Sequence, residues 1–554
     1  MMDSFTTIII FIIALCCIFL LLKYVSFYRA KKFRQKLNSK FGEKPSRDND
    51  FASVSSYWNE KMSHKDMLNY IDGITWDDLE MNKVFDRINT CNSSVGEEYL
   101  YSMLHEPEMN INTLTQRETL MEYLSANPEI RLDLQVILSK IGRENYNGLS
   151  SFCYDVNSKK LKRPYIYTVL ACLPLLFTAL LLLKSPVIIL CLILSIITNG
   201  VVYYYISKRI VRGISAMRYF SAVLWGAGKI SAACENIDNT IIENLKLSYN
   251  VFKKLGGSLS GIAQQRLSDI DFLIEYIRII FLTNIRSYNK LLDAIEKNND
   301  KFRLLFTCVG EVDALISTLS LRQSLPFYSL PVFYMSNELN IKDIYHPLLD
   351  NPIPNTVDIT KSSLISGSNA SGKSTFIKSV AINGIMAQTL HTCTAKLYQT
   401  RPALIMTSMA VRDNITLGES YFITEIKSLK RILKKIPDIY CICIIDEILR
   451  GTNTIERIAS SASVLNYVSE LDCLCIAATH DIELTSMLAS RYDNYHFSEQ
   501  ITQNGISFDY IIKNGPSRTK NAIKLLEHMG FDDSIIKSAQ DLVQVFEYSK
   551  TWKL

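Results

Sequence analysis

The stretch "LISGSNASGKSTFIKSV", residues Leu364–Val380, decides the fold of the C-terminal part of this chain. Its segment Gly367–Ser374 fits the pattern GxxxxGK[ST], in which glycines allow successive backbone N–H groups to turn toward phosphate oxygens. The apolar run before the segment predicts a strand. The run after it predicts a helix, whose N-terminal dipole attracts anions. Both flanks argue against a chance match in a surface loop, so the stretch predicts a phosphate-binding loop for a nucleoside triphosphate.

Each part of this loop has an expected role. Lys373 is expected to neutralise the terminal phosphates, and the Ser374 hydroxyl is expected to bind Mg²⁺. ATP and Mg²⁺ are therefore the expected cofactors. The predicted nucleotide-binding residues are Gly367, Ser368, Asn369, Ala370, Ser371, Gly372, Lys373, Ser374 and Thr375.

Two later stretches supply candidate catalytic groups. In "YCICIIDE" an apolar strand is expected to deliver Asp446 to the Mg²⁺ shell, with Glu447 beside it to orient or deprotonate the attacking water. "CIAATH" is expected to end another strand at Thr479 and His480, where a polar pair can sense the γ-phosphate. The alternative for His480 is a structural histidine whose hydrogen bonds are satisfied within the fold.

The pattern of the chain separates a helical part from an α/β part. From about residue 331 to 512, short apolar β-branched runs alternate with helical stretches, which predicts a mainly parallel sheet covered on both faces. Helical periodicity dominates before that, and no proline interrupts the chain from Gly213 until Pro326, which favours a lever or a bundle. The segment Asn92–Ser94 is expected to cap a helix that carries four apolar or aromatic residues: Tyr99, Leu100, Met103 and Leu104.

Three apolar runs are candidates for membrane spans: 5–25, 165–183 and 186–206. Basic residues follow the first run and do not precede it, which favours an uncleaved anchor over a secretory signal. Only Lys184 and Ser185 separate the other two runs, so they predict a helical hairpin. Its outer ends carry the basic residues Lys159, Lys160, Lys162, Arg163, Lys208, Arg209 and Arg212. These charges place both hairpin ends in the cytoplasm; a buried helix pair of a soluble core is the alternative.

Composition narrows the possible chemistry only slightly. The net charge of +5 over 554 residues is mild and gives no electrostatic argument for nucleic acid. The 13 cysteines form no CxxC pair and no His/Cys cluster of the kind that binds zinc. They are expected to be reduced thiols of a cytosolic part.

Several motifs together resemble the ordered signatures of the MutS mismatch-repair ATPases. The motifs are "LISGSNASGKSTFIKSVAINGIMAQ", "GESYFITEI", "IIDEILRGTNTIERIASSASVLNYV" and "ATHDIELT". "IYHPLLDNPIPNTVDI" resembles the segment that leads into that ATPase domain, and "GISFDYIIKNGPSRTKNAIKLLEHMGFDDSIIKSAQDL" resembles its dimerising C-terminal extension. The similarity is strong over 344–542 and looser in the helical part.

The resemblance implies a fold and a mechanism. The fold would be an α/β P-loop NTPase of the ABC type, following an α-helical core and lever region. Gly418, Glu419 and Ser420 would reach the nucleotide of a partner subunit, so that ATP joins a homodimer and hydrolysis releases it. This chain departs from the family pattern at Ile448–Leu449, where the family has a glycine before the arginine, and at Glu456–Arg457, where Asp-Gly is usual. No aromatic residue in 351–355 stands where the family stacks on adenine.

These observations predict a multi-pass protein of the cell membrane with a cytoplasmic ATPase domain. It is expected to be a membrane-anchored variant without the mismatch-recognition domain, because the space before Trp76 holds an anchor and a linker. The expected domains are an anchor (1–28), a basic linker (29–59), a first helical core (60–160), a transmembrane hairpin (161–210), a second helical core and lever (211–330), the ATPase domain (331–515) and a C-terminal dimerisation extension (516–554).

The sequence does not determine the molecule on which this ATPase acts. DNA is a possible partner through the resemblance, although composition does not show it. A transporter-type ATPase is disfavoured because the LSGGQ-type signature is missing. A nucleotide-gated membrane scaffold with little turnover is a further alternative.

Overall fold

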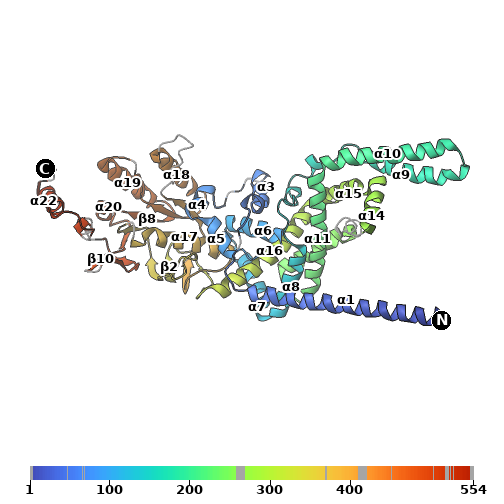
Figure 1. The fold of residues 1–554 in the computed structure, drawn as a ribbon. Helices are drawn as coiled ribbons and strands as arrows, with labels where there is room; N and C mark the ends of the chain where they lie inside the picture. Colours follow the sequence, from blue (N-terminus) through green and yellow to red (C-terminus); the bar gives the residue numbers. More distant parts are fainter. Residues whose placement is uncertain are drawn as a thin grey trace. The chain divides into compact units, whose positions relative to one another are not determined.

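The computed structural model describes residues 4–46, 48–64, 67, 69–256, 269–368, 371–409, 421–450, 452–502, 505–517, 523, 526–527 and 529–549. The chain forms two compact units (Figure 1). The helical unit comprises Met1–Met67, Ile88–Met103 and Thr115–Ser324, and the sheet unit comprises Leu68–Arg87, Leu104–Leu114 and Leu325–Leu554. Two short segments of the N-terminal half therefore belong to the sheet unit. The domain boundaries expected from the sequence stay predictions.

Long helices build the helical unit around an aromatic centre. The ring of Phe220 lies 5.1 Å from that of Phe302 and 5.9 Å from that of Phe252, centroid to centroid, and all three side chains are buried. The α-helices wholly or mainly in this unit are α1 (Ser4–Lys40), α2 (Phe51–Val54), α3 (Ser56–His64), α6 (Ser94–His105), α7 (Ile111–Ala126), α8 (Pro128–Ile141), α9 (Tyr165–Leu180), α10 (Pro186–Arg209), α11 (Val211–Ala233), α12 (Thr240–Phe252), α14 (Asp269–Ile280), α15 (Thr283–Lys297) and α16 (Asn299–Ser324). The helical region expected from the sequence is confirmed.

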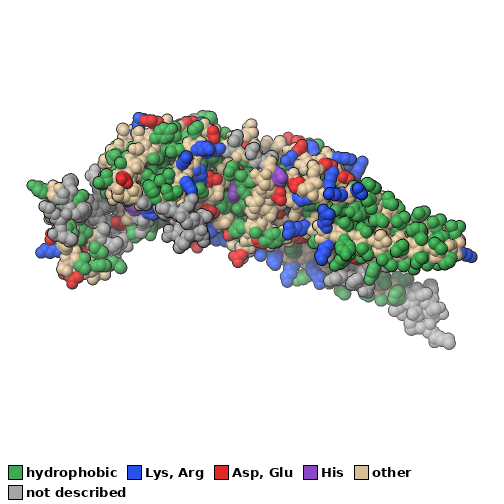
Figure 2. Space-filling model, turned by 90° about the horizontal axis from the view of Figure 1, so that it is seen from above, with side chains coloured by type: hydrophobic (Ala, Val, Ile, Leu, Met, Phe, Trp, Pro, Cys, Tyr) green, Lys and Arg blue, Asp and Glu red, His purple; other side chains and the backbone are tan. Residues whose placement is uncertain are grey.

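The predicted hairpin consists of α9 and α10, which run side by side away from the other helices of this unit (Figure 1). Four described helices are long and apolar enough to cross a membrane: Phe11–Lys40, Tyr165–Leu183, Pro186–Arg209 and Asn299–Ser324. The last is 83% buried inside the unit and is a core helix, whereas the windows of the first three are at most 11% buried. On the face shown in Figure 2, hydrophobic side chains cover the hairpin and Lys and Arg side chains gather next to it.

Polar contacts fix the hairpin to α14. Asn199, inside α10, is fully buried, and its Nδ2 donates to the carbonyl oxygens of Leu170 at 2.9 Å and Ile280 at 2.7 Å. The hydroxyl of Tyr203 lies 2.9 Å from Oε1 of Glu275 on α14. An amide inside an apolar helix is tolerated when its donors find backbone acceptors. Asn199 therefore joins α9, α10 and the end of α14.

The first helix is continuous from Ser4 to Lys40. Arg34, near its C-terminal end, pairs with Glu129 on α8 at 2.9 Å and also contacts Asp133. The guanidinium of Arg131, on the same helix, stacks 3.6 Å from the ring centroid of Phe41. The segment expected as a basic linker, 29–59, thus contains the end of α1, all of α2 and the start of α3.

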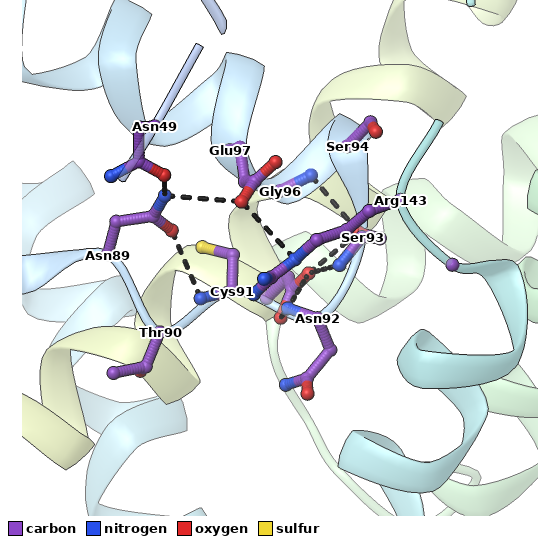
Figure 3. A network of polar contacts seen from close by, with 12 residues as sticks. Asn49, Asn89, Thr90, Cys91, Asn92, Ser93, Ser94, Gly96, Glu97 and Arg143 are labelled. Atoms are coloured by element: carbon purple, nitrogen blue, oxygen red, sulfur yellow. Dashed lines mark hydrogen bonds and ion pairs between the residues drawn. The ribbon is translucent and has the colours of Figure 1, made fainter. Parts of the chain in front are cut away.

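A buried polar network holds the start of α6 (Figure 3). Ser93 caps this helix as expected, because its Oγ accepts the N–H of Gly96 at 3.1 Å. The carboxylate of Asp313, on α16, accepts from the N–H groups of Asn92 at 3.0 Å and Ser93 at 2.8 Å, and from the Ser93 hydroxyl at 2.6 Å. Gly96 packs so closely on this carboxylate that a side chain there would overlap it.

The sheet unit contains a six-stranded sheet in the order β12-β9-β4-β8-β7-β6. All its neighbouring pairs are parallel except β12 with β9. Its strands are β4 (Ser363–Ser366), β6 (Leu404–Ser408), β7 (Cys441–Asp446), β8 (Cys473–Thr479), β9 (Asp493–His496) and β12 (Lys513–Asn514). Buried runs such as "CLCIAAT" in β8 explain the parallel arrangement. The expected α/β fold with a mainly parallel sheet is confirmed.

Smaller sheets and helices complete this unit. A four-stranded sheet, in the order β1-β5-β2-β3, and the hairpin of β10 with β11 accompany the main sheet. The remaining strands are β1 (Val332–Phe333), β2 (Leu339–Ile344), β3 (Asn355–Ile359), β5 (Leu397–Thr400), β10 (Glu499–Thr502) and β11 (Gly505–Phe508). The α-helices are α4 (Gly73–Asp78), α5 (Met81–Ile88), α17 (Lys373–Thr389), α18 (Tyr421–Lys435), α19 (Thr454–Val468), α20 (Ile482–Met487) and α22 (Asp533–Ser549).

The short helix α4 is fastened to the edge strand β6. The carboxylate of Asp78 accepts from the Thr407 hydroxyl at 2.6 Å and from the Met409 N–H at 3.1 Å. Asp72, just before the helix, pairs with Arg431 on α18. These bonds explain why Leu68–Arg87 belongs to the sheet unit.

Candidate nucleotide site

The glycine-rich loop lies between β4 and α17, as the sequence predicts. Gly367 and Gly372 have φ angles of +135° and +105°, which side chains rarely permit. At Gly367 a Cβ would also press on the backbone oxygen of Phe497. The loop conformation thus depends on these two glycines. Asn369 and Ala370 lie outside the described residues.

The side chain of Lys373 is buried and folds back over the loop. Its Nζ donates to the carbonyl oxygen of Ser368 at 2.7 Å and to that of Gly367. Burial lowers the pKa of Lys373 to about 8, against the opposing attraction of Asp446 and Glu499. Two neutral carbonyl groups compensate a buried ammonium only in part. The site therefore favours an anion.

The other loop residues lie at graded depth around this lysine. Ser371 is buried, and its Oγ donates to the Ser368 carbonyl oxygen at 2.6 Å. Ser374 is half-buried and Thr375 is exposed at the start of α17. The Ser374 hydroxyl is thus placed where a ligand can reach it.

Asp446 ends β7, beside β8 and close enough to Lys373 to raise its pKa. Its Oδ1 is buried and has no hydrogen-bond partner among the residues that the structure describes. No described group of three or more His, Cys, Asp or Glu residues can hold a metal by itself. Mg²⁺ at such loops takes one or two protein ligands and completes its shell with phosphate and water. Asp446 and Ser374 fit that limited role.

Glu447 and His480 come together at the ends of β7 and β8. Nε2 of His480 lies 2.8 Å from Oε1 of Glu447, and the other carboxylate oxygen contacts Arg450. Burial is the largest cause that lowers the pKa of His480, followed by Lys373 and Arg450. The imidazole is therefore neutral at pH 7 and orients the carboxylate by hydrogen bonding. The two predicted catalytic residues are neighbours.

Glu425, which lies in the motif "GESYFITEI" but has no role assigned from the sequence, holds the chain after Glu447. Glu425, on α18, is buried and accepts the N–H of Arg450 at 3.1 Å and that of Leu449. Glu447 and Leu449 both have positive φ angles, +57° and +58°. Such conformations cost free energy in residues other than glycine and need support from their surroundings. Glu425 supplies that support through successive backbone N–H groups.

The structure shows the conformation and contacts of two residues that depart from the family pattern, Leu449 and Arg457. Leu449 stands at the expected glycine position and adopts a conformation that glycine favours. Arg457, in place of another glycine, pairs with both carboxylate oxygens of Asp481 at 2.6 and 3.0 Å. Since Asp481 follows His480 directly, this ion pair fixes the end of β8 to α19.

Tyr510 is a second residue that sequence patterns did not single out. Its ring packs against Gly372, where a Cβ would lie 3.1 Å from Cδ1 of the tyrosine. Asn355 donates its Nδ2 to the Tyr510 carbonyl oxygen at 2.9 Å and accepts the Ile512 N–H at 2.7 Å. Asn355, at the start of β3, thus holds the backbone of Tyr510 so that its ring lies beside the loop. Gly418, Glu419 and Ser420, the predicted contacts to a partner's nucleotide, lie outside the described residues.

Comparisons with known proteins agree with this site. The family model MutS domain V matches residues 363–547. DNA mismatch repair protein MutS of Aquifex pyrophilus is 29% identical over 281 residues, which cover 48% of this chain and 32% of that protein. The protein of the same name from Clostridium botulinum is 28% identical over 306 residues, 52% of this chain and 31% of its own. MutS protein homolog 4 of Mus musculus is 31% identical over 286 residues, which cover 48% of this chain and 29% of that protein.

The alignments thus span about a third of the length of these curated relatives. The matched residues contain β4, the glycine-rich loop, Asp446, Glu447 and His480, together with most of α22. Over residues 363–547 this chain therefore carries a MutS domain V, and over that segment it is similar to the MutS proteins.

Proposed function

We propose that this protein binds and hydrolyses ATP at the loop between β4 and α17. The observation that carries the proposal is the meeting of a buried lysine, Lys373, with a buried carboxylate oxygen of Asp446 that lacks a partner among the described residues. Both groups are satisfied at once by an anionic nucleotide with its metal. The pair Glu447–His480 lies next to them at the strand ends.

The residues of the site divide the reaction among themselves. Backbone N–H groups of the loop and the ammonium of Lys373 bind the phosphates. Ser374 and Asp446 would hold Mg²⁺, which when bound neutralises phosphate charge. Glu447 accepts a proton from the attacking water, and neutral His480 keeps its carboxylate in place.

A Glu447→Gln exchange tests the hydrolytic assignment. The amide keeps the size of the side chain but cannot accept the proton, so kcat should fall by about a hundredfold or more while ATP still binds. Purified full-length protein is assayed for phosphate release and for binding of a fluorescent ATP analogue. Glu470→Gln, a half-exposed carboxylate of the same unit, is the matched control. Unchanged turnover in Glu447→Gln contradicts the assignment.

We also propose that α1, α9 and α10 cross the cell membrane, with the sheet unit in the cytoplasm. Three long apolar helices with exposed side chains support this, as do the basic residues at the hairpin's outer ends. Membranes that contain the protein are extracted with alkaline carbonate, and the protein should stay in the membrane fraction. Its release into the soluble fraction would contradict the proposal.

We propose that the ATPase acts on DNA, because the relatives bear the name DNA mismatch repair protein. Full-length protein in neutral nanodiscs should bind duplex DNA, and affinity should fall steeply with added salt. Homoduplex and mismatched duplex are compared with and without ATP. If neither binds at 50 mM salt, the nucleotide-gated scaffold without a DNA role replaces this proposal.

A further inference from the structure

A polar cavity of about 490 Å³ opens at the base of the hairpin. One wall is the start of α9, with Pro164, Tyr165 and Thr168, and the other is α15. The residues contributed by α15 are Thr283, Arg286, Ser287, Asn289, Lys290 and Asp293. All of these lie in the helical unit, far along the chain from the nucleotide site.

The charges around this cavity favour an anion. Arg286 and Lys290 lie one helical turn apart, so both project from the same side of α15. Neither has an ion-pair partner among the described residues. The single acid of the lining, Asp293, lies 3.4 Å from the ammonium of Lys160, which also pairs with Glu296 outside the cavity. These two carboxylates share one lysine, so together with Arg286 and Lys290 the group still carries a net positive charge. Hydroxyl groups of Thr168 and Ser287 add neutral hydrogen-bond donors.

The cavity also lies at a defined depth along the hairpin. Tyr165, the first residue of the apolar run, is 63% exposed, and Tyr204 and Tyr205 near the end of α10 are 62% and 68% exposed. Exposed tyrosines at the ends of apolar spans mark the interface between hydrocarbon and water. The basic residues beyond them, such as Lys162 and Arg209, mark the headgroup layer. The cavity begins at Pro164 and thus lies in that layer.

We propose that this cavity binds the phosphate headgroup of an anionic phospholipid from the cytoplasmic leaflet. The proposal rests on the membrane topology proposed above. Arg286 and Lys290 bind the phosphodiester, Thr168 and Ser287 donate to its oxygens, and the acyl chains follow the apolar surface of α9. Basic pockets between helices at the cytoplasmic side of a membrane favour such headgroups.

The test compares lipids on the full-length protein in a neutral detergent. Phosphatidylglycerol and phosphatidylcholine of equal chain length are titrated, and bound lipid is counted by native mass spectrometry. Wild type should bind phosphatidylglycerol at least about tenfold more tightly, and the double variant R286A/K290A should lose that preference. The control K253A/K254A removes the same charge from an exposed site of the same unit and should keep it.

Three results would overturn the inference. One is equal binding of the two lipids by wild type, and another is an unchanged preference in R286A/K290A with its melting temperature unaltered. The third is full competition by millimolar inorganic phosphate, which identifies a site for free phosphate. Carbonate extraction of the same proteins separates the two proposals, because wild type and both variants should stay in the membrane even if the lipid preference is absent.

Discussion

Lys373 is the residue on which the pH dependence of ATP binding depends, through its ammonium group. Its pKa of about 8 lies below the ordinary value because the side chain is buried. Phosphates favour the charged form, so binding takes up a proton above pH 8 and the dissociation constant rises with pH there. We expect an increase approaching tenfold per pH unit between pH 8.5 and 9.5, and little change from pH 6.5 to 7.5.

Fluorescent ATP titrations of the Glu447→Gln variant measure this without turnover. Lys373→Arg is the control, because its guanidinium stays charged and any binding that it retains should vary less with pH. Burial lowers the pKa of His480 below its ordinary value, so this imidazole does not titrate above pH 8, where the change is expected. A pH-independent dissociation constant in the lysine protein would refute the prediction.

Glu425 is predicted to act as a positioning residue for Glu447. In Glu425→Gln one of the two N–H groups, of Leu449 or Arg450, loses its acceptor, so the strained turn that carries Glu447 loosens. We expect kcat to fall about tenfold with ATP affinity changed less than about twofold. A purely structural role would instead lower stability and change both parameters together. Glu470→Gln again serves as the control.

At the scale of elements, local sequence signals predicted more than long-range contacts did. The glycine loop, β7 with Asp446 and the Ser93 cap all depend on neighbouring residues, and the structure has these elements where the patterns placed them. The role of Glu425 depends on α18 approaching a turn 24 residues away, and that of Asp313 on a contact across 220 residues. Such pairings follow from packing, so no periodicity or motif indicated them.

The contact between α16 and the start of α6 gives a stability prediction. Asp313→Ala leaves the N–H groups of Asn92 and Ser93 and the Ser93 hydroxyl without their buried acceptor. We expect a loss of about 3 kcal/mol, seen as a lower melting temperature of the purified protein. Asp300→Ala on the same helix should have almost no effect, because that carboxylate is 91% exposed and its ion pair with Arg303 is local. Equal melting temperatures for both variants would contradict this account of the network.

At the scale of the whole molecule, the family relationship predicts association driven by nucleotide. If Gly418, Glu419 and Ser420 contact the partner's ATP, the Glu447→Gln variant should accumulate as a dimer when ATP and Mg²⁺ are present. Mass photometry in nanodiscs measures this, with ADP as the control nucleotide. Ser420→Ala should weaken the dimer about tenfold or more. A monomer under every nucleotide condition would remove the composite site from the proposed function.

The continuous first helix has a consequence for how this protein stands on a surface. An α-helix rises 1.5 Å per residue, so the nine steps from Val25 to Arg34 span about 14 Å. In the proposed topology, α1 leaves the lipid and reaches its ion pairs on α8 without a flexible joint. It is therefore a rigid spacer that fixes the distance between the bilayer and the rest of the helical unit. Two glycines inserted after Arg29 would turn this spacer into a flexible linker.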